Sequence, residues 1–180
     1  FTATADEETR VEIVEKLFDG HAPTIFLQGF DRPNIHLAFA AKDGPRAQII
    51  NFANARKEQA GIVYCGTRAK TDTLAKALTE SRHSACHYHG GMDADDRRNV
   101  ERRFQQEDGL IVCATIAFGM GIDKPDIRWV AHADLPKSIE SYYQEIGRAG
   151  RDGAPAETLT LFGPDDIRYR RQQIDEGLAP

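Results

Sequence analysis

Residues 61–68 read Gly-Ile-Val-Tyr-Cys-Gly-Thr-Arg, and a helix-like stretch at residues 70–80 follows them. The first five residues are uniformly apolar and have the length of a buried strand, because a strand covered on only one face would alternate apolar and polar side chains. The glycine, threonine and arginine mark the turn into the next helix. A buried strand followed at once by a helix is the repeating unit of a parallel sheet.

The same alternation extends along the rest of the chain. It predicts strands at residues 24–27, 35–39, 85–88, 110–114, 129–132 and 158–162, and helices at residues 6–18, 45–57, 93–105, 138–146 and 165–174. This order predicts an α/β fold, with a mostly parallel β-sheet flanked by helices on both faces. Ligands of such sheets bind beyond the carboxyl ends of the strands, so we expect the functional loops at that edge.

The composition is that of a globular protein and limits the functional classes. No apolar stretch approaches the roughly eighteen residues needed to span a bilayer, which argues against a transmembrane role. The formal net charge of −5 argues against nucleic-acid binding through a broad basic face, but not through a narrow groove of a few arginines and amides. Cys65, Cys86 and Cys113 suit thiols in a reducing compartment better than a disulfide framework. The opening, which lacks an initiator Met, suggests an excised fragment.

The strongest chemical signal is the string Gln-Glu-Ile-Gly-Arg-Ala-Gly-Arg-Asp-Gly at residues 144–153. Arg148 and Arg151 are three residues apart, so we expect them on one face of a helical turn. The flanking glycines let guanidinium groups approach another surface closely. Paired arginines suit the spread negative charge of a phosphoryl group in transfer. An alternative of equal weight to phosphate binding is a glycine-rich helix end whose arginines are solvated.

Three more loops follow strand-like runs. Residues 114–123 read Ala-Thr-Ile-Ala-Phe-Gly-Met-Gly-Ile-Asp, in which a threonine and bare amides suit phosphates and the aspartate suits a ribose hydroxyl. Thr67 and Arg68 stand at a helix start, where anions bind. Gly90 offers close backbone approach. The structural alternatives are a strand-to-loop turn and, for Thr67, a helix cap, which by itself is the more frequent use.

Two kinds of site are disfavoured. The Gly-x-x-x-x-Gly-Lys-Ser/Thr phosphate loop does not occur in the printed sequence, and the Asp-Glu-Glu-Thr string at residues 6–9 belongs to the first turn of a helix rather than to a magnesium site. Cys86, His87 and His89 do not make a zinc site, because alternate strand residues point to opposite faces and no second ligand pair follows.

Together and in this order, the motifs closely resemble those of RecQ-family superfamily-2 DNA helicases. The resemblance covers nearly the whole chain and rests on residues 1–5, 30–34, 64–68, 114–123 and 144–153. The strings at residues 117–125 and 147–153 are specific to that family rather than to RNA helicases or chromatin remodellers. One departure is the Gly90-Gly91 pair, where the family more often has Ala-Gly.

The resemblance implies two parts and a set of site residues. Residues 1–30 would be the tail of a first RecA-like domain with a linker, and residues 31–180 a second, helicase C-terminal RecA-like domain. Arg151 would be an arginine finger on the γ-phosphate of ATP, supported by Arg148. The resemblance further implies nucleotide contacts from Asp123, Gln144 and Gly121, and contacts with the single-strand DNA backbone from Thr67, Arg68, Gly90 and Thr115.

The implied activity is ATP-dependent 3′–5′ DNA unwinding in recombination and repair. ATP with Mg²⁺ would be bound mainly by the upstream domain in cis, the partner would be single-stranded or duplex DNA, and zinc would belong to a downstream subdomain. We expect the chain alone to be inactive, and its location to be the bacterial cytoplasm with the nucleoid, or the nucleus in a eukaryote. The alternatives are a non-catalytic DNA-binding or protein-docking module, and an RNA-directed motor.

Overall fold

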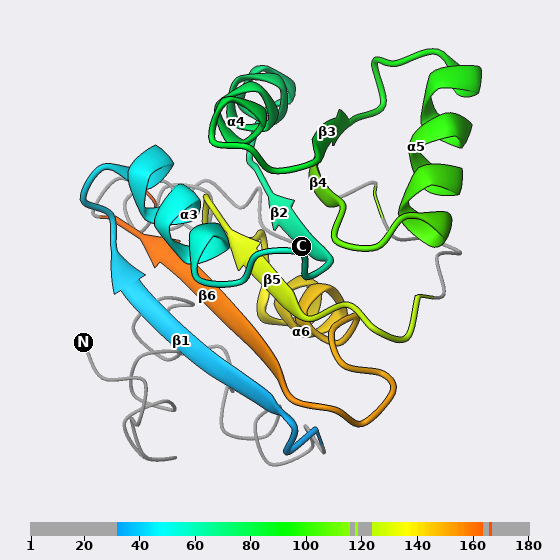
Figure 1. Cartoon of the computed structure of the whole chain (residues 1–180). Helices are drawn as coiled ribbons and strands as arrows, with labels where there is room; N and C mark the ends of the chain where they lie inside the picture. Colours follow the sequence, from blue (N-terminus) through cyan, green and yellow to red (C-terminus); the bar gives the residue numbers. More distant parts are fainter. Residues whose placement is uncertain (1–31, 116–117, 119–123, 164–165, 167–180) are drawn as a thin grey trace.

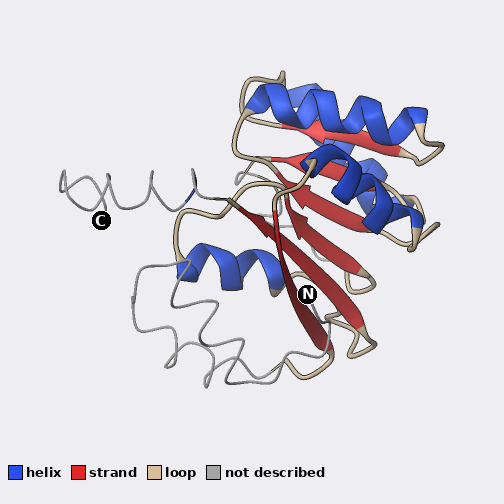
Figure 2. Ribbon diagram, turned by 90° about the vertical axis from the view of Figure 1, so that its left-hand side faces the viewer, coloured by secondary structure: helices blue, strands red, loops and turns tan. Residues whose placement is uncertain are grey.

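The predicted alternation of strands and helices appears in the computed structural model, which describes residues 32–115, 118, 124–163 and 166 (Figure 1). The strands are β1 Ile35–Ala41, β2 Gly61–Tyr64, β3 Ala85–Tyr88, β4 Ile111–Ala114, β5 Trp129–His132 and β6 Ala156–Phe162. The helices are α3 Pro45–Asn54, α4 Arg68–Glu80, α5 Ala94–Gln106 and α6 Ile139–Ile146. Helices lie on both sides of the sheet (Figure 2).

The described strands form one sheet in the order β1-β6-β5-β2-β4-β3. Every pairing between them is parallel, and Tyr64 at the end of β2 lies opposite both Ala114 of β4 and His132 of β5. The α/β prediction with a mostly parallel sheet is therefore confirmed. Because parallel strands share one direction, the loops that follow β2, β3 and β4 meet at one edge of the sheet.

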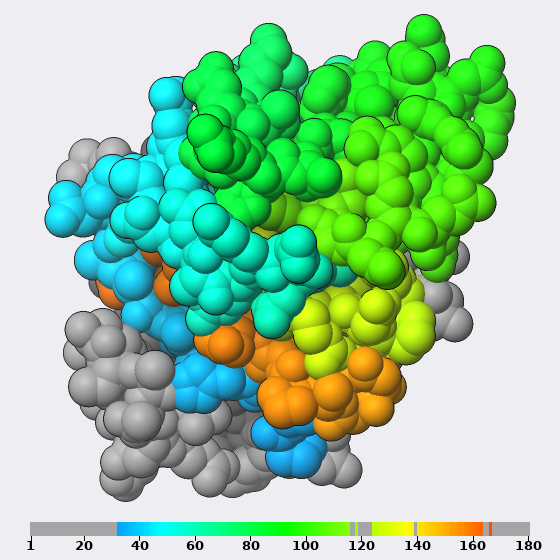
Figure 3. All heavy atoms as spheres, in the orientation of Figure 1, coloured from blue at the N-terminus to red at the C-terminus, as the bar shows by residue number. Residues whose placement is uncertain are grey.

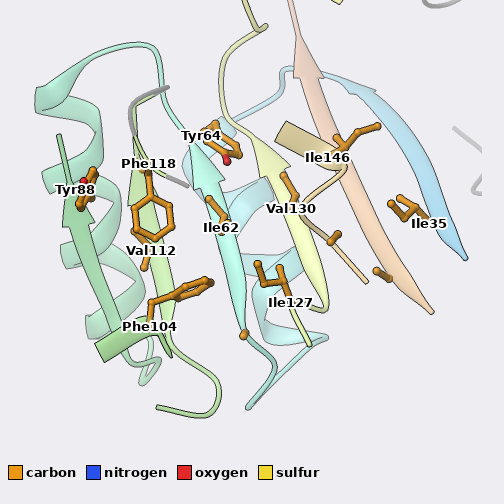
Figure 4. Close-up of a cluster of buried hydrophobic side chains, with 14 of the residues drawn as sticks. Ile35, Ile62, Tyr64, Tyr88, Phe104, Val112, Phe118, Ile127, Val130 and Ile146 are labelled. Carbon is orange, nitrogen blue, oxygen red and sulfur yellow. The ribbon is translucent and has the colours of Figure 1, made fainter. Parts of the chain in front are cut away.

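Two apolar layers explain why the central strands are apolar on both faces. On one face α5 and α6 pack over the sheet through residues such as Phe104 and Ile146, in the layer that Figure 4 shows. On the other face α3 and α4 cover it through residues such as Ile49 and Leu78, and their atoms form part of the surface that Figure 3 shows. In β2, Ile62 points into the first layer and the next residue into the second.

Most predicted boundaries agree with the structure to within two residues. α3 is the exception, because it ends at Asn54, three residues before the predicted end. Glu58 then has a φ of 63°, a left-handed conformation that a continuing helix cannot contain. The elements expected at residues 6–18 and 24–27, and nearly all of the one at 165–174, lie outside the described residues.

Gly61→Ala tests the packing between β2 and β5. An added methyl group would overlap the indole of Trp129, which is fully buried and is packed edge-on by Phe52 with 5.5 Å between ring centroids. We expect the free energy of unfolding, measured by urea denaturation, to fall by about 1–3 kcal/mol. Gly163→Ala is the control, because its methyl group would meet only side-chain atoms at 3.5 Å or more. Equal stability of the two variants would contradict this packing.

Candidate functional site

The four residues predicted to contact nucleic acid gather at the carboxyl edge of the sheet. The loops that carry them are joined by backbone hydrogen bonds from Cys65 to the Ala114 carbonyl (2.8 Å) and from Thr115 to the Tyr88 carbonyl (3.3 Å). The Arg68 guanidinium lies over the next loop, since a Cβ added at Gly90 would be 3.6 Å from its Nη2 atom. The structure thus brings together Thr67, Arg68, Gly90 and Thr115, the first three exposed and the last half-buried.

Thr67 also caps α4, which is the structural role given above as the alternative for this residue. Its Oγ1 accepts a hydrogen bond from the Lys70 backbone N–H at 3.2 Å. The hydroxyl hydrogen is not used in this bond, so Thr67 can still donate to a phosphate oxygen. Capping and phosphate contact are therefore compatible at this residue.

Asp134, which the sequence analysis missed, holds the loop after β2 in place. Its carboxylate accepts hydrogen bonds from the Gly66 N–H at 2.7 Å, from Lys70 Nζ at 2.8 Å and from Lys42 Nζ at 3.1 Å. Burial alone would raise the pKa of Asp134, but the bonds from Lys70, Gly66 and Lys42 outweigh it and hold this pKa below the usual value. A cavity of about 200 Å³ lies beside this group, between α3 and α4.

The arginine loop, residues 147–153, lies at the opposite edge of the sheet. The Gly150 N–H donates to the Ile127 carbonyl at 2.8 Å, just ahead of β5, and the Asp152 N–H donates to the Pro125 carbonyl at 3.0 Å. The loop then leads into the first residue of β6, Ala156. The expectation that all functional loops lie at the carboxyl edge is wrong for this loop, because α6 runs back across the sheet before the loop begins.

The arginines themselves follow the helix rather than lie on it. α6 ends at Ile146, and the chain continues in turns with Gly150 at a φ of 58°, so the prediction of a shared helical face is wrong. Arg148 is half-buried and Arg151 exposed. Gln144 is exposed on the last turn of α6. The other two predicted nucleotide contacts, Asp123 and Gly121, lie outside the described residues.

Two residues from the start of the described chain clamp the arginine loop. Arg32 donates from Nη1 to the Gly147 carbonyl at 3.0 Å and from Nη2 to the Ala149 carbonyl at 2.6 Å. Asn34 Nδ2 donates to the Gly150 carbonyl at 2.8 Å and to that of Ala154 at 2.9 Å. The sequence marked residues 30–34 only as a turn and as part of the family resemblance. The partners of Arg32 and Asn34 are backbone carbonyls more than a hundred residues away in the chain. No local pattern in the sequence indicates hydrogen bonds of this kind.

Metal chemistry has no support within the described ranges. No group of three or more His, Cys, Asp or Glu side chains among these residues could hold an ion. All three cysteines are free, and burial raises the pKa of Cys65 to about 12 and that of Cys86 to about 11, which keeps both thiols protonated near neutral pH. No helix in the described part is long and apolar enough to cross a membrane.

Residues 45–153 match the family model described as the helicase conserved C-terminal domain. The chain belongs to this family. It is 46% identical to the ATP-dependent DNA helicase RecQ of Pasteurella multocida, over 93% of this chain and 26% of the relative. It is 39% identical to the RecQ helicase of Bacillus subtilis, over 97% of this chain and 29% of the relative. The helicase domain thus spans little more than a quarter of these relatives, and its resemblance to RecQ helicases is confirmed.

Solved structures confirm the RecA-like fold. The helicase domain superposes on the Escherichia coli DEAD-box protein SrmB with a TM-score of 0.63 and 26% identity, over 72% of this chain and 78% of that one. It superposes on the C-terminal domain of the DEAD-box protein Dbp5 with a TM-score of 0.61 and 17% identity, over 79% and 82% of the two chains. Arg32 and Asn34 precede the family-matched segment of the helicase domain, yet they hold its last loop.

The low pKa of Asp134 makes the stability of the helicase domain depend on pH. A carboxylate whose pKa is lower in the folded than in the unfolded state stabilises the fold above the unfolded pKa, about 3.9, and this contribution disappears as the pH falls through the folded value. We therefore expect the difference in unfolding free energy between wild type and Asp134→Asn to be constant near neutral pH and to shrink below about pH 4. Urea denaturation as a function of pH measures it, and a gap that stays constant in acid would contradict the role given to this carboxylate.

Proposed function

We propose that this domain supplies an arginine finger and single-strand DNA-backbone contacts to an ATP-driven 3′–5′ DNA helicase of RecQ type, active in recombination and repair. One observation carries the proposal: the arginine loop is clamped at one edge of the sheet by Arg32 and Asn34, while groups suited to phosphate gather at the other. Two separate phosphate-directed sites on one domain are what a motor that couples hydrolysis to DNA movement requires.

The nucleotide site would be completed by an upstream RecA-like domain in cis. ATP bound there with Mg²⁺ supplies the phosphoryl group whose cleavage drives movement. The residues here fit that group, because Arg151 is exposed on a loop whose backbone is fixed by hydrogen bonds on both sides. Arg151 would neutralise charge on the transferred phosphoryl group, and Arg148 and Gln144 would support it. Asp123 and Gly121 are proposed for the ribose side of the same nucleotide.

The carboxyl-edge loops would hold the backbone of one DNA strand. Arg68 offers a charged fork, Thr67 and Thr115 offer hydroxyl groups, and Gly90 lets a phosphate approach the main chain. These groups would contact phosphates, which are the same at every nucleotide. Binding would therefore be independent of the base sequence of the DNA. The names of the RecQ relatives, which are DNA helicases, favour DNA over RNA as the strand.

Arg151→Ala tests the nucleotide half of the proposal. In the full-length protein we expect DNA-stimulated ATP hydrolysis to fall by a factor of about 10³ or more, because a finger arginine acts on charge that develops only in the transition state. Lys76→Ala is the control, since Lys76 is exposed on α4 and pairs only with Asp72 among the described residues. The 180-residue chain alone should show no hydrolysis. Activity of this chain by itself, or an unimpaired Arg151→Ala protein, would refute this half.

Arg68→Ala tests the DNA half. We expect weaker binding of single-stranded DNA and a log–log salt dependence shallower by about 0.7, the change for the loss of one phosphate contact. Lys57→Ala removes the same charge from the turn between α3 and β2, at the edge of the sheet away from these loops, and should change neither quantity. The measurement is fluorescence anisotropy at several salt concentrations. An unchanged slope for Arg68→Ala would remove this residue from the DNA path, and tighter binding of matched RNA than of DNA would favour the RNA-directed alternative.

A further inference from the structure

A pair of ionisable side chains is buried between β5 and α6, the helix that leads into the arginine loop. His132 Nε2 lies 2.9 Å from Glu145 Oε1, and the two side chains are only 1% and 9% exposed. His132 is the last residue of β5, and Glu145 belongs to the last turn of α6. Polar groups inside an apolar layer destabilise a fold unless they are hydrogen-bonded, so a pair at this place calls for a role that apolar side chains could not fill.

Aromatic rings fix the histidine in one orientation. Tyr64 stacks on it with ring centroids 5.2 Å apart and planes 22° apart, and Tyr142 of α6 packs against it at 5.6 Å. The other ring nitrogen, Nδ1, is buried and has no hydrogen-bond partner within the described part of the chain. The imidazole is therefore held by Glu145 at one nitrogen and by ring packing elsewhere.

The same cluster reaches the arginine loop by two routes. The backbone carbonyl of Glu145 accepts the Arg148 N–H at 3.4 Å, so the residue that pairs with His132 also starts the turn that carries Arg148. The Tyr64 hydroxyl is buried near the charges of Glu145, Arg148 and Arg151. Burial and Glu145 raise the pKa of Tyr64, while the two arginines oppose that rise. The hydroxyl therefore stays protonated, and the electrostatic influence of the two arginines reaches it.

We infer that the His132–Glu145 pair and Tyr64 form a positioning unit for Arg148. The inference rests on the proposed function of Arg148 in ATP hydrolysis and adds three residues that the proposal does not use. The Glu145 side chain, bound to His132, fixes the end of α6 from which the turn to Arg148 begins, and Tyr64 limits where the guanidinium can lie. All three side chains are buried, so each would act through Arg148 and none would have a catalytic role of its own.

If the cluster had a purely structural role, its mutation would change other kinetic constants than the loss of a positioning residue would. A packing residue would affect folding, or would affect nucleotide and DNA binding together. A positioning residue lowers kcat while the ATP KM and the DNA Kd stay nearly constant, because only the transition-state contact is misplaced. Its effect must also vanish once the group that it positions has been removed.

The experiment is a double-mutant cycle in the full-length protein, with ATP hydrolysis measured at saturating single-stranded DNA. We expect Glu145→Ala to lower kcat by roughly 10²-fold, the loss that follows a misplacement of about 1 Å, with little change in KM. Glu145→Gln keeps an acceptor oxygen for His132 and should restore most of the rate. In the Arg148→Ala background, Glu145→Ala should lower kcat no further.

Tyr64→Phe provides a second cycle that keeps the ring and removes only the hydroxyl. It should lower kcat in the wild-type background and have no effect in the Arg148→Ala background. If thermal melting shows that Glu145→Ala no longer folds, this second cycle tests the inference by itself. If Glu145→Ala or Tyr64→Phe lowers kcat further in the Arg148→Ala background, the inference is overturned and the proposed function stays intact. Full activity of Arg148→Ala itself would instead refute the role proposed for that arginine, and the inference with it.

Discussion

The pairing of β2 with β4 on one side and β5 on the other is the constraint on which the rest of the structure depends. A central strand covered by helices on both faces disfavours polar side chains along its length. The chemistry of the domain is therefore displaced to the strand ends, where Gly66, Thr67 and Arg68 follow β2 and Asp134 follows β5. The two polar side chains that remain at the ends of these strands, those of Tyr64 and His132, stack on each other.

The two groups of loops that we propose to face phosphates are connected through α6. This helix leads from the carboxyl end of β5 to the turn that carries Arg148. One short helix thus gives a change at the proposed DNA-binding edge a direct mechanical route to the arginine loop. This arrangement suits a domain in which strand grip and hydrolysis are proposed to alternate.

The sequence predicts the part of this structure that depends on local patterns. β5 has the predicted bounds because burial on both faces leaves a continuous apolar signal. β3, a half-buried strand at the edge of the sheet, also has the predicted bounds. The loops that follow β2, β3 and β4 could be located from these strand ends. The location of the arginine loop could not be predicted, since it depends on the path of α6 and on hydrogen bonds from Arg32 and Asn34. The Asp134 anchor and the His132–Glu145 pair are likewise contacts between distant segments, and periodicity carries no information about such partners.

Net charge is a poor guide to function here, and the ion pairs show why. Lys42 and Lys70 are both bound to Asp134, Arg128 to Asp152, Arg103 to Glu107 and Arg56 to Glu157. In these pairs the charges of acid and base cancel locally, so neither contributes a strong field of its own to the surface. Arg68, in contrast, has no acidic partner among the described residues and lies over two glycines at the carboxyl edge. A polyanion responds to the local field of such a group within a Debye length of about 10 Å, not to the sum over the chain. A domain with a negative net charge can therefore hold a phosphate at such a site, provided that the acidic side chains nearby are paired with cations of their own.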